Sequence, residues 1–401
     1  MSNDTLPEIR FPEFTDEWEQ VKLKDVATVF DGTHQTPKYT ESGVKFVSVE
    51  NIKTLETEKY ISQEAYDSEY SKKQAEKGDV LMTRIGDIGT AKVIETDEPL
   101  AYYVTLALLK PNEIDSSFLA WLISSPEVQR NIWKRTLHIA FPKKINLGEI
   151  NQIEMNVPSL EEQTKIGTFF KQLDDTIALH QRKLDLLKET KKGFLQKMFP
   201  ENGAKVPEIR FPGFTEDWEQ RKFKEFSKKT GKKNTKDLDF PAYSVSNKAG
   251  LISQTEQFDG SRLDDLEKTN YKFVEPNEFA YNPARVNVGS IAFNNLGMTV
   301  IVSSLYVVVK MSEDLDNEFI LQFIKSPTFI KEVKRNTEGS VREYLFYENF
   351  ANIKFPFTRN KEEQQKIGAF FKQLDDTIAL HQRKLDLLKE TKKGFLQKMF
   401  V

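Results

Sequence analysis

The sequence predicts two tandem half-units, each combining an α/β (α+β) domain with a long helix, related by pseudo-twofold symmetry. The first observation is a repeat: residues 166–199 recur at 367–400 with 33 of 34 positions identical. The second is a shorter repeat, LPEIRFPEFTDEWEQVKLKD at 6–25 and VPEIRFPGFTEDWEQRKFKE at 206–225. The third is that the segments between the repeats, 26–157 and 227–356, hardly match in sequence. A frame that repeats around different inserts indicates one scaffold carrying two different binding surfaces.

These repeats divide the chain into six consecutive segments. In chain order they are a first lead-in (1–25), a first middle segment (26–157), a first long helix (158–199), a linker with the second lead-in (200–226), a second middle segment (227–356) and a second long helix (357–401). Each middle segment is long enough to form its own hydrophobic core.

The repeated tail has the apolar spacing of a coiled coil, because its seam positions alternate steps of four and three residues. The seam comprises Ile166, Phe170, Leu173, Ile177, His180, Leu184 and Leu187 in the first copy, and Ile367, Phe371, Leu374, Ile378, His381, Leu385 and Leu388 in the second. Since one chain carries both copies, we expect the two helices to pack antiparallel. His180 and His381 then lie near the centre, where they fix the register or form a pH switch or metal site.

The exposed positions of the tail also repeat, although packing requires only the apolar stripe to do so. They include Lys171, Gln172, Asp174, Asp175, Gln181, Arg182, Lys183, Asp185, Lys188 and Glu189. A recent duplication preserves every position. Alternatively, both outer faces bind the same partner, so that the chain recruits two copies of one protein. The two explanations are compatible.

Both middle segments contain strand-like runs followed by a helical pair. Predicted strands are 44–51, 79–85 and 102–110 in the first segment, and 240–247, 278–285, 288–295 and 300–310 in the second. The helical pairs, 116–135 and 317–336, align without a gap, and Ser125-Pro126 falls on Ser326-Pro327. The two segments are therefore expected to share one fold.

Composition excludes several classes of protein. The chain has no cysteine, which excludes disulfides, thiolate nucleophiles and cysteine-based zinc sites. No apolar run is long enough to cross a bilayer, and the polar start MSNDTLPEIRF is not typical of a secretion signal, so we expect a cytoplasmic protein without a membrane partner. No phosphate-binding G-x-x-x-x-G-K-[ST] loop, no histidine pair with metal-ligand spacing and no catalytic constellation is present. We therefore expect a non-catalytic chain.

Charge gives only local signals for nucleic-acid binding. The first middle segment has 15 Lys and Arg against 19 Asp and Glu, and the second has 17 of each. However, the stretch 221–236 carries eight Lys and Arg against one Glu, which suits phosphate contacts unless it is a solvated loop.

Candidate binding residues lie in predicted loops. Arg84 and Arg285 stand beside glycine turns and at similar places in the two halves. An arginine there can reach guanine or phosphate, or form a surface salt bridge. The turn at 31–37 is rich in hydrogen-bonding side chains, although it is equally compatible with an ordinary capped turn. The full set of candidates is Thr33, His34, Gln35, Lys38, Arg84, Lys143, Lys144, Lys228, Lys229, Ser246, Asn247, Lys248, Asn282, Arg285, Arg342 and Tyr344.

The chain resembles the specificity subunits of type I restriction–modification systems over essentially its whole length. The resemblance rests on the duplicated tails with their entries VPSLEEQTKIGTFF (157–170) and FTRNKEEQQKIGAFF (357–371). Weaker motifs support it: DGTHQTP at 31–37, TRIGDIG at 83–89, YSVSNKAGLI at 243–252 and YNPAR at 281–285.

The resemblance implies a non-catalytic reader of double-stranded DNA. The middle segments are then target recognition domains, each contacting one half of a split asymmetric site, and the helices are the spacer between them. Two modification subunits, carrying the adenine methyltransferase chemistry, and two restriction subunits would assemble on this frame. S-adenosylmethionine, ATP and Mg would then be bound by those partners, and no cofactor by this chain. The principal alternative is a coiled-coil scaffold that binds proteins without reading DNA; an enzyme in its own right is a third possibility.

Overall fold

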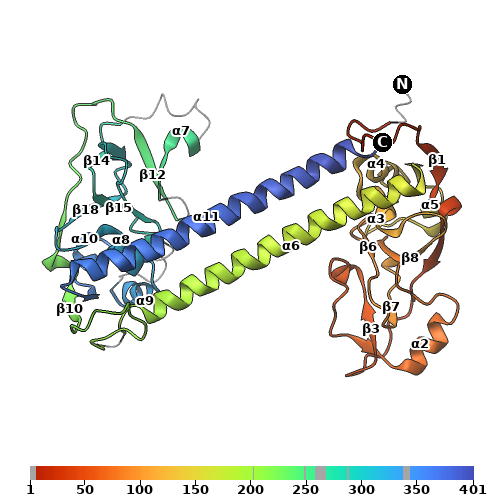
Figure 1. The fold of residues 1–401 in the computed structure, drawn as a ribbon, viewed down its shortest axis with the longest axis horizontal. Coiled ribbons are helices and arrows are strands. Elements are labelled where there is room, and N and C mark those ends of the chain that lie inside the picture. Colours follow the sequence, from red (N-terminus) through yellow and green to blue (C-terminus); the bar gives the residue numbers. More distant parts are fainter. Residues whose placement is uncertain (1–5, 202, 248–249, 258–267, 287–288, 337–343) are drawn as a thin grey trace. The chain divides into compact units, whose positions relative to one another are not determined.

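The computed structural model describes residues 6–201, 203–247, 250–257, 268–286, 289–336 and 344–401. It divides into two compact units (Figure 1). Unit 1 comprises residues 1–181 together with 383–401, and unit 2 comprises residues 182–382. Each unit thus contains one lead-in, one middle segment and part of both long helices. The sequential segments predicted above cross this division, because each long helix contributes to both units.

Unit 1 contains the first middle segment and its flanking elements. Its described elements are β1 (Glu19–Lys22), α1 (Leu23–Val26), β2 (Ala27–Asp31), β3 (Val44–Val47), η1 (Val49–Asn51), β4 (Tyr60–Ile61), α2 (Gln63–Tyr70), β5 (Val80–Thr83), β6 (Ala91–Val93), β7 (Leu100–Tyr102), β8 (Leu106–Pro111), α3 (Ser116–Ser124), α4 (Pro126–Arg135), α5 (Leu147–Asn151) and β9 (Glu154–Val157). An antiparallel sheet of order β2-β8-β5-β6 packs beside α3, and a smaller sheet of order β4-β3-β7 lies farther from the long helices (Figure 1).

Unit 2 contains the second middle segment. Its described elements are β10 (Glu219–Lys222), η2 (Phe223–Glu225), β11 (Ser227–Lys229), β12 (Ala242–Ser246), β13 (Gly250–Ser253), α7 (Gln254–Gln257), β14 (Lys272–Val274), β15 (Glu278–Tyr281), β16 (Ile291–Phe293), β17 (Val300–Val302), β18 (Val307–Met311), α8 (Asn317–Ile324), α9 (Pro327–Asn336), α10 (Tyr347–Phe350) and β19 (Lys354–Phe357). Its sheets have the orders β11-β18-β15-β16 and β13-β12-β17-β14.

The two middle segments share one topology, as the sequence predicts. The sheets β2-β8-β5-β6 and β11-β18-β15-β16 correspond strand for strand, and the other sheet of each unit contains one parallel pair, β3 with β7 and β12 with β17. Strand β14 is an addition in unit 2. The predicted strands 102–110 and 300–310 are wrong in one respect, because each is two strands joined by a short turn. The strands belong to different sheets and are both buried, which makes the sequence read as one apolar run.

The helical pairs are where the sequence predicts them. In unit 1, Asp115 accepts a hydrogen bond from the backbone N–H of Phe118 (2.8 Å), and Ser125 caps the helix that begins at Pro126. In unit 2, Asp316 and Ser326 occupy the same capping positions of α8 and α9. Proline is favoured at the first helical position because its missing N–H has no intrahelical acceptor. The Ser-Pro dipeptide therefore divides both pairs at the same place.

Helices α6 (Leu160–Lys197) and α11 (Lys361–Lys398) have 38 residues each. Within unit 1 the start of α6 lies against the end of α11, with the rings of Phe169 and Phe395 centred 5.0 Å apart. Within unit 2 the end of α6 lies against the start of α11, with Phe194 and Phe370 5.2 Å apart. The pairing in each unit is therefore antiparallel. All fourteen predicted seam residues, His180 and His381 included, are buried or half-buried.

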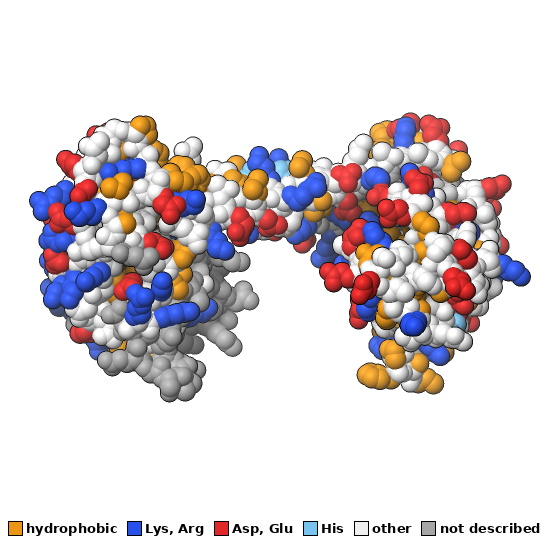
Figure 2. All heavy atoms as spheres, turned by 90° about the horizontal axis from the view of Figure 1, so that it is seen from below, with side chains coloured by type: hydrophobic (Ala, Val, Ile, Leu, Met, Phe, Trp, Pro, Cys, Tyr) orange, Lys and Arg blue, Asp and Glu red, His pale blue; other side chains and the backbone are white. Residues whose placement is uncertain are grey.

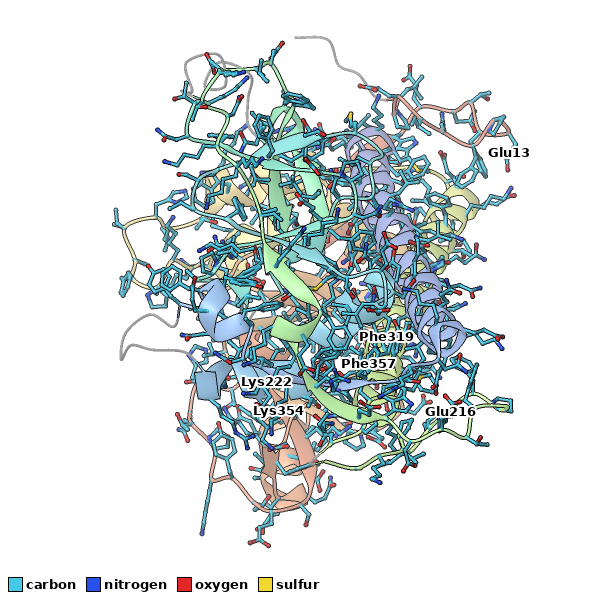
Figure 3. The ribbon with its side chains drawn as sticks, turned by 90° about the vertical axis from the view of Figure 1, so that its left-hand side faces the viewer. Glu13, Glu216, Lys222, Phe319, Lys354 and Phe357 are labelled. Carbon is cyan, nitrogen blue, oxygen red and sulfur yellow. The ribbon has the colours of Figure 1, made fainter. Side chains whose placement is uncertain are left out.

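Each lead-in fastens the two helices of its own unit. Arg10 forms a bidentate ion pair with the buried Glu162 near the start of α6 (both contacts 2.7 Å), and the N–H of Ile9 donates to the carbonyl of Lys398 at the end of α11. Arg210 and Ile209 repeat these contacts with Glu363 and Lys197. The lead-in then continues into a strand that pairs with the last strand of the middle segment; in unit 2 Lys222 lies opposite Lys354 (Figure 3).

Candidate nucleic-acid interface

Arg84 lies at the centre of the candidate site in unit 1. Arg84, Asp31 and the carbonyl of Ile145 form a cluster, here called the Arg84 hub. Its guanidinium contacts Asp31 (2.5 Å) and donates to the carbonyl of Ile145 (3.2 Å), and the residue is only 6% exposed. Asp31 in turn contacts the ring of His34 at 2.7 Å. Arg84 therefore holds two loops together from inside the unit. Its predicted role in contacting guanine or phosphate directly does not fit this position, because its donors face an internal carboxylate and carbonyl.

The 31–38 segment combines a buried start with an exposed end. Thr33 is buried and exchanges backbone hydrogen bonds with Tyr102 and Val104, whereas His34, Gln35 and Lys38 are exposed. Gly32 is required for this close approach, since a Cβ there would lie 2.3 Å from the carbonyl oxygen of Tyr103. Thr33 therefore positions the turn, and the three exposed side chains are available to a ligand.

The loop 137–144 lies beside the 84–89 turn. The N–H of Gly86 donates to the carbonyl of Lys143 (2.9 Å), and Lys144 forms β-bridges to Ile85 and Leu137. Lys143 and Lys144 are both exposed, with the Lys143 ammonium 4.6 Å from the centre of the Trp133 ring. Three loops far apart in sequence, at 31–38, 84–89 and 137–144, therefore converge around Arg84.

A comparable group of loops occurs in unit 2. Asn282 Oδ1 accepts from the N–H of Ala284 (3.0 Å), and the N–H of Leu345 donates to the carbonyl of Pro283, which brings Tyr344 beside this turn. Asn247 lies against Gly289, and Ser246 ends strand β12. Arg285 is exposed. Lys248 and Arg342 lie outside the described residues.

Arg84 and Arg285 are not equivalent, contrary to the sequence-based expectation. Thr83 pairs with the first residue of β8, and Tyr281 pairs with the first residue of β18, so Asn282 occupies the position of Arg84. Arg285 lies three residues farther into the turn. The same place in the two units thus carries different chemistry: a buried arginine in one, and an asparagine with an exposed arginine in the other.

Lysines lie on the neighbouring strands β11 and β18 of one sheet in unit 2 and on the edge strand β14 of the other. Lys228 and Lys310 are exposed directly opposite each other, and Lys229 contacts Glu348 (3.4 Å). Lys272 donates to the carbonyl of Tyr306 (2.7 Å); burial lowers the pKa of its ammonium, and the nearby Lys229 and Lys233 lower this pKa further. Figure 2 shows Lys and Arg side chains spread over the visible face of this unit. Lys272 and Lys310 were missed in the sequence because they lie within apolar strands rather than in the 221–236 stretch.

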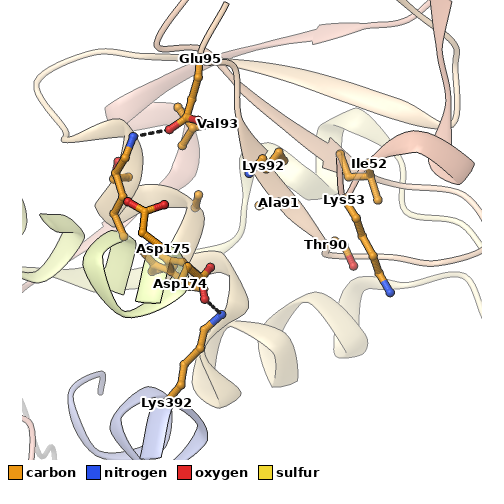
Figure 4. A pocket seen from close by; sticks show the side chains of 14 residues that line it. Ile52, Lys53, Thr90, Ala91, Lys92, Val93, Glu95, Asp174, Asp175 and Lys392 are labelled. Atoms are coloured by element: carbon orange, nitrogen blue, oxygen red, sulfur yellow. Dashed lines mark hydrogen bonds and ion pairs between the residues drawn. The ribbon is translucent and has the colours of Figure 1, made fainter. Parts of the chain in front are cut away.

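A pocket of about 440 Å³ in unit 1 lies between β6, α3 and the helix pair (Figure 4). Two ion pairs lie in its lining: Lys392 contacts Asp174 (2.5 Å), and Lys171 contacts Glu95. The Lys392 ammonium also lies 4.3 Å from the centre of the Trp121 ring. The contacts of Lys171 with Glu95 and of Lys392 with Trp121 hold the middle segment against the helices. In the described part of the chain, no three His, Cys, Asp or Glu side chains are grouped so as to hold a metal ion. Among the same residues, none of the helices has the length and apolar character needed to traverse a bilayer.

Comparison with known proteins identifies the family. Residues 15–189 and 215–390 match the family described as the type I restriction modification DNA specificity domain. These ranges make up most of the chain, which therefore belongs to the family of DNA-binding specificity subunits of type I restriction–modification systems. The predicted family and the predicted fold class, with two tandem specificity domains, are thereby confirmed.

Individual relatives agree with this assignment. The chain is 24% identical over 412 residues to a putative type I restriction enzyme MjaX specificity subunit of Methanocaldococcus jannaschii, covering 96% of this chain and 93% of the relative. It is 23% identical over 263 residues to the MjaVIII specificity subunit of the same organism, covering 61% of this chain and 60% of that protein.

Two solved structures share the fold. The S subunit of a type I restriction–modification system from M. genitalium superposes with a TM-score of 0.65 at 13% identity, over 99% of both chains. A chain from a structure that addresses complex assembly and conformational transition of the type I system gives a TM-score of 0.52 at 14% identity, over 94% of this chain and 96% of that one.

Proposed function

We propose that this chain reads a bipartite, asymmetric DNA site, with one target recognition domain for each half. The observation that carries the proposal is that two units of one topology present loops at corresponding places with different side chains. In the loop after β5, unit 1 has the buried Arg84, whereas the equivalent loop after β15 in unit 2 has Asn282 and the exposed Arg285. Unit 1 also offers the exposed His34, Gln35 and Lys38 in the turn beside Arg84. Different groups on equivalent loops read different bases, because sequence is read by hydrogen bonds to base edges.

The long helices would act as the spacer that fixes the gap between the two half-sites. Their seam residues are buried or half-buried throughout, and both ends are fastened by the lead-ins through the ion pairs of Arg10 and Arg210. A stiff spacer holds the two recognition domains a fixed distance apart. The base pairs between the half-sites are then spanned, and neither domain contacts them to read their sequence.

The outer faces of the helices would bind two modification subunits. Leu179 and its copy Leu380 are 59% and 57% exposed, and Leu186 and its copy Leu387 are both 67% exposed. Leu179 and Leu186 lie one heptad apart on α6 and outside its seam, and Leu380 and Leu387 lie in the same way on α11. Each helix thus presents an apolar stripe without a described partner in this chain. Equal exposure in both copies supports one partner bound twice. Two restriction subunits would then join.

In this assembly the chain itself performs no chemistry. S-adenosylmethionine, ATP and Mg would be bound by the modification and restriction subunits, in the cytoplasm where their DNA is found. The chain would supply sequence recognition and geometry.

Selection from a random duplex library tests the proposal and defines the recognised site in the same experiment. The chain is mixed with its modification subunit, and duplexes retained in the presence of competitor DNA are sequenced. Enrichment of two short motifs at a fixed separation is expected. A complex that assembles but enriches no sequence would instead support a coiled-coil scaffold that binds proteins only.

A further inference from the structure

The loop 137–144 of unit 1 has at its tip two apolar side chains that no other described residue of the chain covers. Ile139 is 99% exposed and Phe141 is 103% exposed, while Leu137 and Trp133 at the base of the loop are 37% and 56% exposed. Figure 2 shows hydrophobic side chains projecting from the lower edge of this unit. Single exposed apolar residues are common, but an isoleucine and a phenylalanine fully exposed at one loop tip indicate a surface that is covered in the functional complex.

The base of this loop is firmly held. Leu137 N–H donates to the carbonyl of Lys144 (2.8 Å), which closes the loop, and Gly86 N–H donates to the carbonyl of Lys143 (2.9 Å). Directly after the loop, Ile145 is fully buried and exchanges hydrogen bonds with Arg84. The loop is therefore continuous with the Arg84 hub, and its apolar tip projects from a fixed base.

The charge around the tip points to a polyanion as the group that covers it. Residues 134–144, KRTLHIAFPKK, contain four Lys and Arg and no Asp or Glu, within a middle segment whose net charge is −4. Arg135 is paired with Glu149 and Glu154, whereas Lys134, Lys143 and Lys144 contact no carboxylate among the described residues. A cationic rim around an apolar tip matches the phosphates and stacked bases of duplex DNA.

We propose that Ile139 and Phe141 enter a base step of the DNA bound by unit 1 and partly unstack it, while Lys143 and Lys144 contact the flanking phosphates. This inference rests on the proposed DNA-reading function. Apolar wedges between base steps kink the duplex and allow it to contact more protein surface. The Phe141 ring supplies a flat apolar face for a base, and Ile139 beside it fills the opened step.

The experiment uses the full chain assembled with its modification subunit and duplexes containing the selected site. 2-Aminopurine is substituted one position at a time, and its fluorescence reports unstacking. Wild type is expected to raise the fluorescence at one step of the first half-site. In Phe141→Ser this rise disappears and affinity falls roughly tenfold, while Phe141→Leu keeps part of both. Methyltransferases take their target base out of the stack. Fluorescence from 2-aminopurine at the position of the methylated adenine is therefore expected in all variants and serves as an internal control.

A second set of variants separates the wedge from the charge. Lys143→Gln with Lys144→Gln is expected to weaken binding and its salt dependence while the unstacking signal at saturation stays. The inference is overturned if Phe141→Ser binds and unstacks like wild type, or if it loses the modification subunit in the absence of DNA, which would identify the tip as a protein contact. Failure of wild type to select any sequence would instead refute the proposed function. Thermal unfolding checks that each variant folds.

Discussion

At the scale of single residues, the buried guanidinium of Arg84 joins the loops on either side of it through Asp31 and the carbonyl of Ile145. Its place beside a glycine turn was clear from the sequence, and so were the polar residues at 31–38. Its burial depends on Asp31 and on the carbonyl of Ile145, which lie 53 and 61 residues away in the chain. Such partners cannot be derived from local patterns, because only the folded sheet brings them together. The exposed residues around the hub remain predictions as DNA contacts.

Removing Asp31 tests the role of the hub. In Asp31→Ala the Arg84 guanidinium loses its charged partner while it stays buried, so the free energy of unfolding should fall by about 3 kcal/mol. Denaturant unfolding of the full chain measures this change. The matched control is His34→Ala, which removes the exposed partner of Asp31 and should change stability by less than about 0.5 kcal/mol. Equal stability of both variants would contradict the structural role of Arg84.

A second residue-scale contrast lies where the middle segments meet the helices. Trp121 of unit 1 packs under Lys392, but its copy position in unit 2 is Gln322, which donates to Asp375 beside Lys191. The ammonium group of Lys325 lies near Lys191 and Asp375 in unit 2. Burial lowers the pKa of its ammonium and Lys191 lowers it further, against the opposing charges of Asp375 and Glu318. Glu318 is itself affected, because burial raises the pKa of its carboxyl group.

The lowered pKa of Lys325 gives a pH dependence of known sign. Between this folded-state pKa and the unfolded value near 10.5, the unfolded chain binds a proton that the folded chain lacks, so stability rises with pH across that window. Lys325→Gln should therefore raise the free energy of unfolding at pH 7 and reduce its rise toward pH 10. Denaturant unfolding of both proteins at pH 7 and at pH 10 measures these free energies. A variant less stable than wild type at pH 7 would show that the charge is favourable.

At the scale of elements, the long helices and the helical pairs followed from the sequence because heptad spacing and Ser-Pro capping are local signals. The strands of the lead-ins did not. Strand β1 pairs with β9, and β10 with β19, across more than 130 residues of chain, and neither lead-in strand has a marked apolar alternation. The split of 102–110 and 300–310 was also missed, because full burial hides the turn between two apolar strands.

Two neighbouring leucines of α6 separate packing from partner binding. Leu184 is 1% exposed in the seam, so Leu184→Ala should cost about 2–4 kcal/mol of stability. Leu186 is 67% exposed, so Leu186→Ala should cost less than about 0.5 kcal/mol. If the outer stripe binds a modification subunit, Leu186→Ala should weaken that association instead, as measured by calorimetry. The reverse pattern would contradict the assignment of the two helix faces.

At the scale of the whole molecule, the duplicated frame carries the functional argument. Both units have one topology, one way of fastening the lead-in to the helices, and different loop residues. The features that repeat in both units are suited to binding two identical partners. The loop residues that differ between the units are suited to recognising two different sequences. Recognised bases could not be predicted from the sequence, because readout depends on where each loop side chain stands relative to the duplex.

Shortening the helices tests the spacer role. Removal of one heptad from both α6 and α11 keeps the seam in phase and shortens each helix by about 10 Å. The unspecified gap should then shrink by about three base pairs while both half-site sequences stay the same. Sequencing of duplexes selected by the shortened chain measures the gap. An unchanged gap would show that the helices do not set the spacing.

The most direct measurement is methylation-sensitive sequencing of DNA from cells that express this chain with its modification subunit. Methyladenine is expected at a split motif with a fixed gap. Replacing residues 26–157 by the corresponding segment of another family member should change only one half of that motif. A methylation pattern independent of this chain, in cells where the complex is shown to assemble, would contradict its role as the DNA reader.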